Sequence, residues 1–362
     1  MNNYFKNTYL LISMNKLVSL IILLGLIFIG NVQAQKSNVN EPKPLFQSEE
    51  MLNLRLEADF TTVFSVTDDS TYFPAKISMA DNNGKIKDIK LKTRTRGHAR
   101  RDEDVCKFSP LRLRFPKKET SNTVFDEQRT IKLVTHCQKA NANEQYIILE
   151  YLIYKAFNIL TDSSFKVRQA KIVYVYSNSK KGPIEKFAFF IEKDKHLAKR
   201  LNAIELESIK IHPMRLNATH ACLMDMFQYM IGNLDYSAYK KHNIKLMGDS
   251  NHESPPIAIP YDFDLCGLVL PNYAVPHPQF NLEKVTDRLY RGFKKDPEIV
   301  YQTIKTFNNK KADIYQLFEN SELLNKKVKK RVIKYLDEFY NIINDEQLVK
   351  VVFIEKARVM HN

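Results

Sequence analysis

Apolar and polar residues alternate along the chain between about residues 50 and 135. A period of two places successive side chains on opposite faces of an extended chain, so the pattern predicts β-strands with one buried face. The turn-forming residues 81–84 separate two of these segments. The alternating apolar positions lie at 52–56, 89–91, 111–115 and 131–133.

A helix interrupts the strand pattern. Asn143 is placed to cap a helix over Glu144–Leu160, and two further strands are expected at 166–176 and 187–191. After these strands the pattern is mostly helical. The segment 220–231 is apolar nearly all round, so we expect a buried helix there. The remaining expected elements are a strand pair at 243–247 and 257–261 and amphipathic helices at 282–293, 298–307 and 325–343.

This order of elements predicts an α+β protein with a two-lobed fold. The sheet-rich N-terminal lobe is expected over 47–200, and the helical C-terminal lobe over 201–362. Residues 35–46 are polar and contain two prolines, so we expect a linker there.

The start of the chain has the three parts of a secretory signal peptide. Lys16 precedes the apolar run 17–29, and Val32 and Ala34 are small residues at the two key positions of an A-x-A-like cleavage site. We therefore expect a signal peptide over 1–34, with Met1 or Met14 as its start, and export to the periplasm or the extracellular space. The alternative is an uncleaved anchor, but the run is shorter than the about 20 residues that span a bilayer. After cleavage no membrane span is expected.

The composition is that of a globular protein: 44% of the 362 residues are hydrophobic and 27% are charged. These values exclude a disordered or collagen-like chain. The net charge of +14 favours anionic partners. No nucleic-acid-binding motif accompanies this charge, so we expect no nucleic-acid partner.

The chain has four cysteines, which could bind a metal ion or form disulfides. None lies in a C-x-x-C pair, which argues against a structural zinc site. An exported protein enters an oxidising compartment, where cysteines pair. We predict a Cys106–Cys137 disulfide, because each residue borders a strand-like segment in the same half of the chain.

Oxygen-bearing side chains follow one another in the middle of the chain. Asp235 comes just after the apolar helix, Asn243 opens a short strand, and Asp262 and Asp264 follow the next strand. A hairpin would bring these groups together, and converging oxygens hold hard cations such as Mg²⁺ beside phosphates. A carboxylate outside the metal shell would then deprotonate a hydroxyl. Taken alone, each of these residues is more typical of a turn or a strand exit; only their order along the chain favours a site.

The first half carries possible phosphate-binding partners. Lys132 lies in the middle of a strand, and Glu150 is the one acid in an otherwise apolar helical run. A strand lysine followed by a helix glutamate is the pair with which kinases hold nucleotide phosphates. Arg96 and Gly97 lie in an arginine cluster, where a glycine allows close approach of the backbone to a phosphate. The alternative is that Lys132 lies on the solvent face of its strand and that the arginines form a solvated edge.

The order of these residues resembles the spore-coat CotH-type kinase family. The resemblance covers roughly residues 86–268. It implies an atypical protein-kinase-like fold and the use of ATP and Mg²⁺ to phosphorylate protein side chains. It also implies that Asp235 is the catalytic base and that Asn243 with Asp262 or Asp264 binds the metal. Lys132 would face the phosphates. The chain departs from the family at 98–101, where His-Ala-Arg-Arg replaces the usual Asn and Ser.

We therefore interpret the sequence as an exported kinase-like protein that transfers phosphoryl from a Mg-nucleotide to a hydroxyl of a protein or small molecule. One alternative is a non-catalytic binding or scaffold protein of the cell envelope, because little ATP is present outside the cytoplasm. The other is a HAD-type phosphatase, because an apolar strand leads into Asp262-Phe263-Asp264.

Overall fold

The structure is a computed structural model, and it describes residues 40–359 apart from 67, 81–83, 98, 103 and 139–142. The predicted signal peptide and the start of the predicted linker lie outside the described residues. None of the helices in the described part has the length and apolar composition needed to cross a bilayer.

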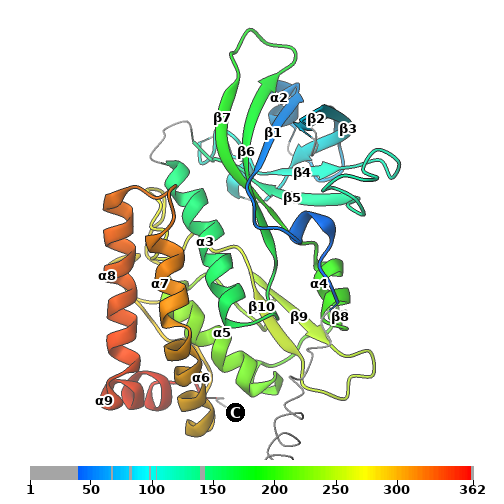
Figure 1. The fold of residues 1–362 in the computed structure, drawn as a ribbon. Helices are drawn as coiled ribbons and strands as arrows, with labels where there is room; N and C mark the ends of the chain where they lie inside the picture. Colours follow the sequence, from blue (N-terminus) through cyan, green and yellow to red (C-terminus); the bar gives the residue numbers. More distant parts are fainter. Residues whose placement is uncertain are drawn as a thin grey trace, which may run out of the picture. The chain divides into compact units, whose positions relative to one another are not determined.

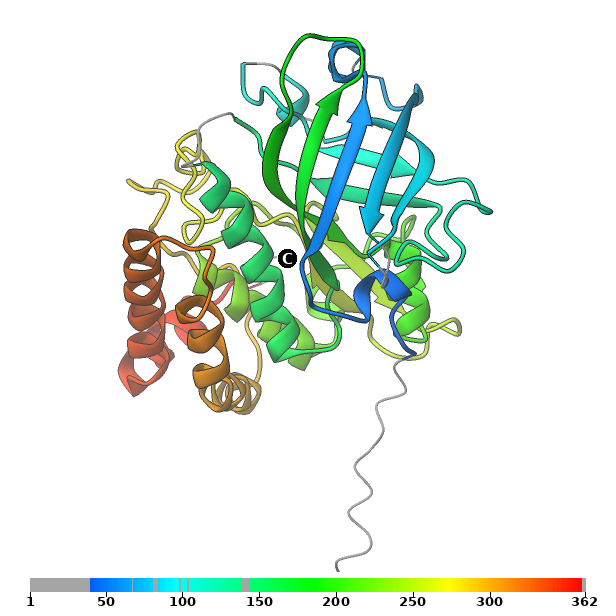
Figure 2. The ribbon, with the colours of Figure 1, turned by 45° about the horizontal axis from the view of Figure 1, so that its top comes forward.

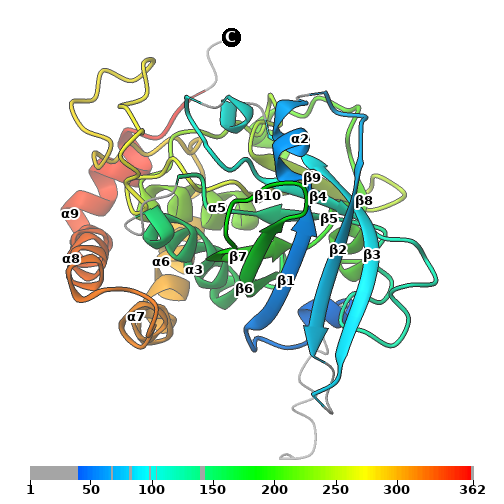
Figure 3. The ribbon, with the colours of Figure 1, turned by 90° about the horizontal axis from the view of Figure 1, so that it is seen from above.

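Seven strands form a closed barrel in the order β1-β2-β3-β4-β5-β7-β6 (Figure 3). β1 makes the closure, since it pairs antiparallel with β2 on one side and parallel with β6 on the other (Figure 2). The strands are β1 (Leu52–Ala58), β2 (Phe73–Ala80), β3 (Ile86–Thr95), β4 (Leu111–Arg114), β5 (Thr130–Val134), β6 (Val167–Tyr176) and β7 (Ile184–Ile191).

The prediction of a two-lobed kinase-like fold is wrong. The strands enclose a barrel with its own apolar core, and the described residues belong to one compact unit. Alternation of apolar and polar residues specifies the two faces of a strand but not its neighbours. The parallel pairing that closes the barrel joins residues far apart in the sequence, such as Leu54 and Ile172, and no local pattern signals it.

A second core joins the helices to the outside of β5, β6 and β7. α3 packs against β6 and β7 on one side and against α7 on another, and α5 packs against α6 and α8 (Figure 1). The helices of this layer are α3 (Glu144–Leu160), α5 (Ala218–Ile231), α6 (Pro297–Asn309), α7 (Lys311–Glu319) and α8 (Lys326–Ile343).

A small antiparallel sheet packs beside α5 in the order β10-β9-β8. Its strands are β8 (Ile204–Glu205), β9 (Ile244–Gly248) and β10 (Ile257–Pro260). The shorter helical elements are α2 (Phe60–Ser65), α4 (Asp194–Arg200), α9 (Glu346–Val349), a π-helix (Lys350–Glu355) and 3₁₀ turns at Pro44–Phe46, Ala99–Arg101 and Pro213–Arg215.

The helix expected at 282–293 is absent, and the segment runs as turns and extended chain. The Asp287 carboxylate accepts the backbone N–H groups of Glu283 and Lys284 at 3.1 and 2.9 Å. Such bonds offer the backbone an alternative to helical pairing. The spacing of apolar residues over 282–293 therefore predicted a helix that does not form.

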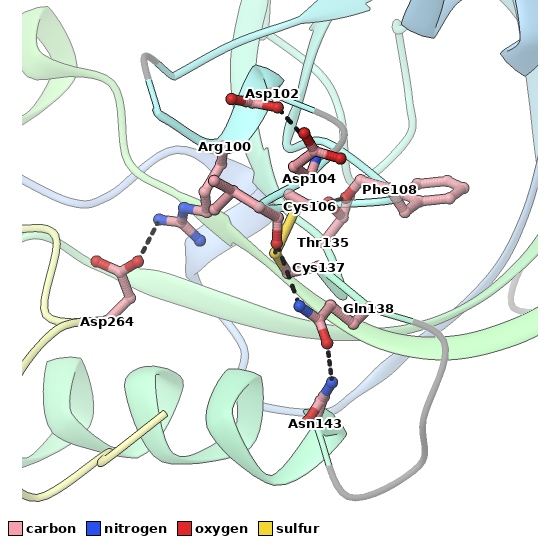
Figure 4. The surroundings of a disulfide bond; sticks show 11 residues. Arg100, Asp102, Asp104, Cys106, Phe108, Thr135, Cys137, Gln138, Asn143 and Asp264 are labelled. Carbon is pink, nitrogen blue, oxygen red and sulfur yellow. Dashed lines mark hydrogen bonds and ion pairs between the residues drawn. A yellow bond between two sulfur atoms is a disulfide. The ribbon is translucent and has the colours of Figure 1, made fainter. Parts of the chain in front are cut away.

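The predicted cysteine pair is bonded: Cys106 and Cys137 form a disulfide, while Cys222 and Cys266 are buried thiols. The disulfide ties the segment that follows the Ala99–Arg101 turn to the segment that follows β5 (Figure 4). A disulfide is compatible with export.

Candidate active site

Asp262 and Asp264 follow β10 directly. β10 pairs antiparallel with β9, and the backbone N–H of Tyr261 donates to the Asn243 carbonyl at 3.0 Å. Asp262 has a φ of 62°, and its N–H donates to the Tyr154 hydroxyl of α3 at 2.8 Å. A positive φ is uncommon outside glycine and persists only where the surrounding structure holds it. The hairpin therefore fixes where both carboxylates lie.

Arg100 bridges these two carboxylates. Its Nη2 lies 3.0 Å from Asp262 Oδ1. The same atom lies 3.4 Å from Asp264 Oδ2 (Figure 4). Burial disfavours the guanidinium charge, but Asp264 and Asp262 raise the pKa of Arg100. The side chains of Arg100 and Asp264 are largely buried, so this contact is screened less by water than a surface pair would be.

Glu150 reaches the same place from α3. It is buried, and neither of its carboxylate oxygens has a hydrogen-bond partner among the described residues. Burial raises the pKa of Glu150 to about 8, Arg100 opposes this shift, and Asp264 and Asp262 add to it. Burial likewise raises the pKa of Asp264, again against Arg100. The charges of Glu150, Asp262 and Asp264 therefore act on one another, with Glu150 and Asp264 buried away from water.

Asp235 is held by its neighbours in the motif. Its Oδ1 lies 2.7 Å from His242 Nε2, and its Oδ2 accepts from Asn243 Nδ2 at 3.0 Å. Gly232 ends α5 in the left-handed conformation, with φ 64°. The Asn233 side chain then accepts the backbone N–H of Asp235 at 3.0 Å. The loop thus aims the carboxylate before any ligand binds.

Asn243 joins Asp235 to the hairpin. Its Nδ2 also donates to the Asp235 carbonyl at 2.7 Å, and its φ is 52°. Both amide-nitrogen bonds go to Asp235, so Oδ1 is the atom of this side chain that is suited to bind a cation. Burial raises the pKa of Asp264 and Arg100 opposes the shift. The charges of Asp262 and then Asp235 add to it. The motif residues and the carboxylates after β10 therefore lie in one electrostatic environment.

Lys132 does not pair with Glu150. Its Nζ lies 3.1 Å from Asp194 Oδ1, and Asp194 also holds Lys245 at 3.3 Å. Burial lowers the pKa of Lys132, with Asp194 opposing the shift. The ammonium also lies 5.2 Å from the centre of the Tyr261 ring, beside the β10 end.

Arg96 and Gly97 lie at the end of β3. Burial lowers the pKa of Arg96, and the Asp262 charge is the strongest effect against it. Gly97 has a φ of 91°, and nothing lies within 4 Å of where a Cβ would be. Arg96 therefore shares the environment of Asp262, and the backbone at Gly97 faces open space.

The site contains carboxylate and amide oxygens that could bind a hard cation. Within the described ranges no group of three or more His, Cys, Asp or Glu side chains has metal-site geometry. The Arg100 guanidinium instead lies among the carboxylates, and the Glu150 oxygens are buried without partners. Carboxylate and amide oxygens are the ligands that Mg²⁺ prefers. The donor set suits Mg²⁺, provided that Arg100 gives way to it.

Three contributing residues were missed from the sequence. Arg100 belonged to the arginine cluster but was not singled out from it. His242 lies within the Asp235…Asn243 motif of the sequence, which gave it no role of its own. Asp194 carries no local signal, because its pairing with Lys132 bridges residues 62 positions apart.

Arg291 also supports the site. Its Nη1 donates to the carbonyls of Leu234 and Tyr236 at 2.5 and 2.6 Å. These carbonyls flank Asp235, so the guanidinium clamps the loop that carries the carboxylate.

The comparisons with known proteins add little. No protein-family model and no curated protein matches the chain. Among solved structures, a proinflammatory kinase from Helicobacter pylori, CtkA, matches with a TM-score of 0.35 and 13% identity, over 67% of this chain and 89% of that chain. A structural neighbour is thus a kinase, but a similarity this weak assigns no function to the chain.

Proposed function

We propose that the protein transfers a phosphoryl group from ATP, bound with Mg²⁺, to a hydroxyl group of a second molecule. The observation that carries the proposal is the bridging of Asp262 and Asp264 by Arg100, with buried Glu150 and the Asp235–Asn243 pair in the same electrostatic environment. Two acid groups after one strand, with a separate and well-oriented carboxylate nearby, are the parts that phosphoryl transfer needs.

The residues divide into three roles. Asp262, Asp264 and Asn243 Oδ1 would hold the cation, which supplies charge stabilisation for the phosphates. Arg96 and Lys132, both half-buried and close to the β10 end, would bind phosphate oxygens. Asp235 would accept the proton of the attacking hydroxyl as the new P–O bond forms and the bond to the nucleoside diphosphate breaks.

Lys132 and Asp194 replace the lysine–glutamate pair expected from the sequence. Asp194 holds two lysines, Lys132 and Lys245, and Lys245 also pairs with Glu205 at 2.6 Å, so the charges of these four residues balance. Glu150 lies instead with Asp264, where its buried oxygens would serve the cation site.

The phosphatase alternative is not favoured. A HAD-type domain needs further parallel strands beside the one that ends in Asp-x-Asp. β10 lies at the edge of a three-stranded sheet, and its partner β9 is antiparallel.

The test is nucleotide binding and turnover with and without Mg²⁺. Wild-type protein, Asp262→Asn and a matched control, Asp313→Asn on the surface of α7, are melted with ATP alone and with Mg-ATP. Wild type and the control should gain about 2–3 kcal/mol at a hundredfold excess over Kd, only when Mg²⁺ is present. Asp262→Asn should lose most of that gain.

Turnover is followed as release of phosphate or self-phosphorylation from γ-labelled ATP, which needs no known acceptor. Mg-dependent binding without any turnover would support the scaffold alternative. Equal melting of wild type under all nucleotide conditions would overturn the proposal.

A further inference from the structure

A cavity of about 920 Å³ opens beside Asp235 and His242. Its wall is formed by the loop after α5, the Pro213–Arg215 turn and residues 291–295. Arg96 and Lys132, the proposed phosphate-binding residues, are not part of this wall. The volume lies within the roughly 300–1,000 Å³ of ligand-binding cavities. The carboxylate of Asp235 thus borders a second space that the nucleotide residues do not line.

The wall of this cavity is strongly basic. Five Lys and Arg side chains and two carboxylates, Asp225 and Asp235, line it, a surplus of three positive charges with the histidines neutral. Lys295 alone of the five pairs with a carboxylate of the described residues, Asp225 at 3.2 Å. The five are Lys240, Lys241, Arg291, Lys295 and Arg358.

The partners of the other basic groups are uncharged. Arg291 donates to two main-chain carbonyls, and Lys241 donates to the Glu207 carbonyl. For Lys240 and Arg358 the described residues provide no side-chain hydrogen bond or ion pair. These four charges are therefore available to an anion.

Two guanidinium groups stack on aromatic rings of the wall. Arg358 lies 4.3 Å from the centre of the Phe293 ring, and Arg291 lies 4.7 Å from that of Phe280. Burial lowers the pKa of Arg291. Tyr236 opposes this shift, and the positive charge of the neighbouring Arg358 adds to it. Neither guanidinium forms an ion pair with a carboxylate of the described residues, and like charges held close together are typical of sites that bind an anion. Stacking fixes the plane of each guanidinium, and the N–H edge of Arg358 is left for bidentate contact, whereas Nη1 of Arg291 already holds two carbonyls.

We infer that this cavity binds the phosphate acceptor, and that the acceptor is an anionic molecule whose hydroxyl lies close to a carboxylate or phosphate group. The inference rests on the proposed function. The hydroxyl would lie at Asp235, which takes its proton as the oxygen bonds to phosphorus, and the anionic groups would lie against Arg358, Lys240 and Arg291. A lysine-rich acceptor would instead meet the surplus positive charge.

The first experiment measures binding without nucleotide, so it does not depend on catalysis. Calorimetry compares three peptides that differ only around a central serine: flanked by glutamates, by glutamines or by lysines. Glycerol 3-phosphate and glycerol form a second matched pair. At least one anionic probe should bind about tenfold or more tightly than its neutral match, and high salt should weaken that binding.

The variants Arg358→Gln and Lys240→Gln locate the site. Both residues lie outside the core, so the fold should be retained, and thermal melting checks this. Each should weaken binding of the anionic probe about threefold to tenfold. Lys305→Gln, an exposed lysine of α6 that does not line the cavity, should leave the binding unchanged.

The outcomes separate this inference from the proposed function. Preference for the acidic peptide indicates a protein segment as acceptor, and preference for glycerol 3-phosphate indicates a small molecule; both support the inference. Equal binding of anionic and neutral probes, or tightest binding of the lysine peptide, overturns it even if phosphoryl transfer is observed. Anion binding that the two variants weaken, without any Mg-nucleotide turnover, would retain the anion site and overturn the kinase proposal.

Discussion

Arg100 Nη2 lies 3.4 Å from Asp264 Oδ2, in a position where a divalent cation would otherwise balance the carboxylates. A guanidinium and a metal ion cannot occupy the same region. Binding of Mg²⁺ therefore requires Arg100 to move, and this residue connects the stability of the protein to its proposed cofactor.

Replacing Arg100 by Gln should destabilise the protein in the absence of metal. Asp262 and Asp264 would remain without the cation that bridges them, and breaking a buried ion pair costs about 3–5 kcal/mol. Mg²⁺ should restore more stability to Arg100→Gln than to wild type. Urea unfolding with and without Mg²⁺ measures this, with Arg55→Gln on the exposed face of β1 as control. Identical Mg²⁺ responses of wild type and variant would contradict the prediction.

Replacing Glu150 by Gln should change how stability depends on pH. Burial raises the pKa of Glu150 from 4.5 to about 8. Between these values the folded protein keeps a proton that the unfolded chain has released, so the free energy of unfolding falls as pH rises. The contribution is fully present below pH 4.5 and is lost by about pH 8. Gln carries no titrating proton, so the variant should lack this slope.

The measurement is the difference in unfolding free energy between Glu150→Gln and wild type at pH 5, 6, 7 and 8. It should grow in favour of the variant by up to about 1.4 kcal/mol per pH unit. Glu185→Gln, an exposed position on β7, is the control. A difference that stays constant across this range would show that Glu150 is ionised throughout.

Replacing Asp235 by Asn should remove turnover while preserving nucleotide binding. General-base catalysis contributes about 100-fold to 10,000-fold to the rate, and Asp235 lies outside the proposed cation ligands. We expect kcat to fall by at least about 100-fold, with the Mg-ATP melting shift retained. If the melting shift vanishes with the turnover, Asp235 belongs to the nucleotide site and not to the acceptor side.

Removing the disulfide should both destabilise the protein and loosen Arg100. Cys106 and Cys137 are 31 residues apart, and a cross-link of this length typically contributes about 3–4 kcal/mol. Arg100 precedes Cys106 by six residues, and the Gln138 side chain that follows Cys137 bonds to both Val105 and Asn143 (Figure 4). The double variant Cys106→Ser/Cys137→Ser should therefore show part of the larger Mg²⁺ response expected for Arg100→Gln.

Wild type under reducing conditions should behave like the double variant, and the buried thiol variant Cys222→Ser should respond to reductant as wild type does. If reductant leaves the stability and the Mg²⁺ response of wild type unchanged, the bond does not hold the Arg100 segment.

Local sequence determined the elements that lie close together in the chain. The alternation around Leu54 and Leu56, the apolar helix that contains Phe227 and the motif from Asp235 to Asn243 all act over a few residues. For this reason their secondary structure, and the short hairpin that brings Asn243 beside Tyr261, could be predicted from hydrophobic period and turn residues.

Tertiary structure alone decided the closure of the barrel, the pairing of Lys132 with Asp194, and the placement of Arg100 between Asp262 and Asp264. Each of these contacts joins residues separated by tens of positions or more. They depend on which surfaces pack together and on how buried charges find partners once water is excluded, and a local pattern of residues carries no record of either.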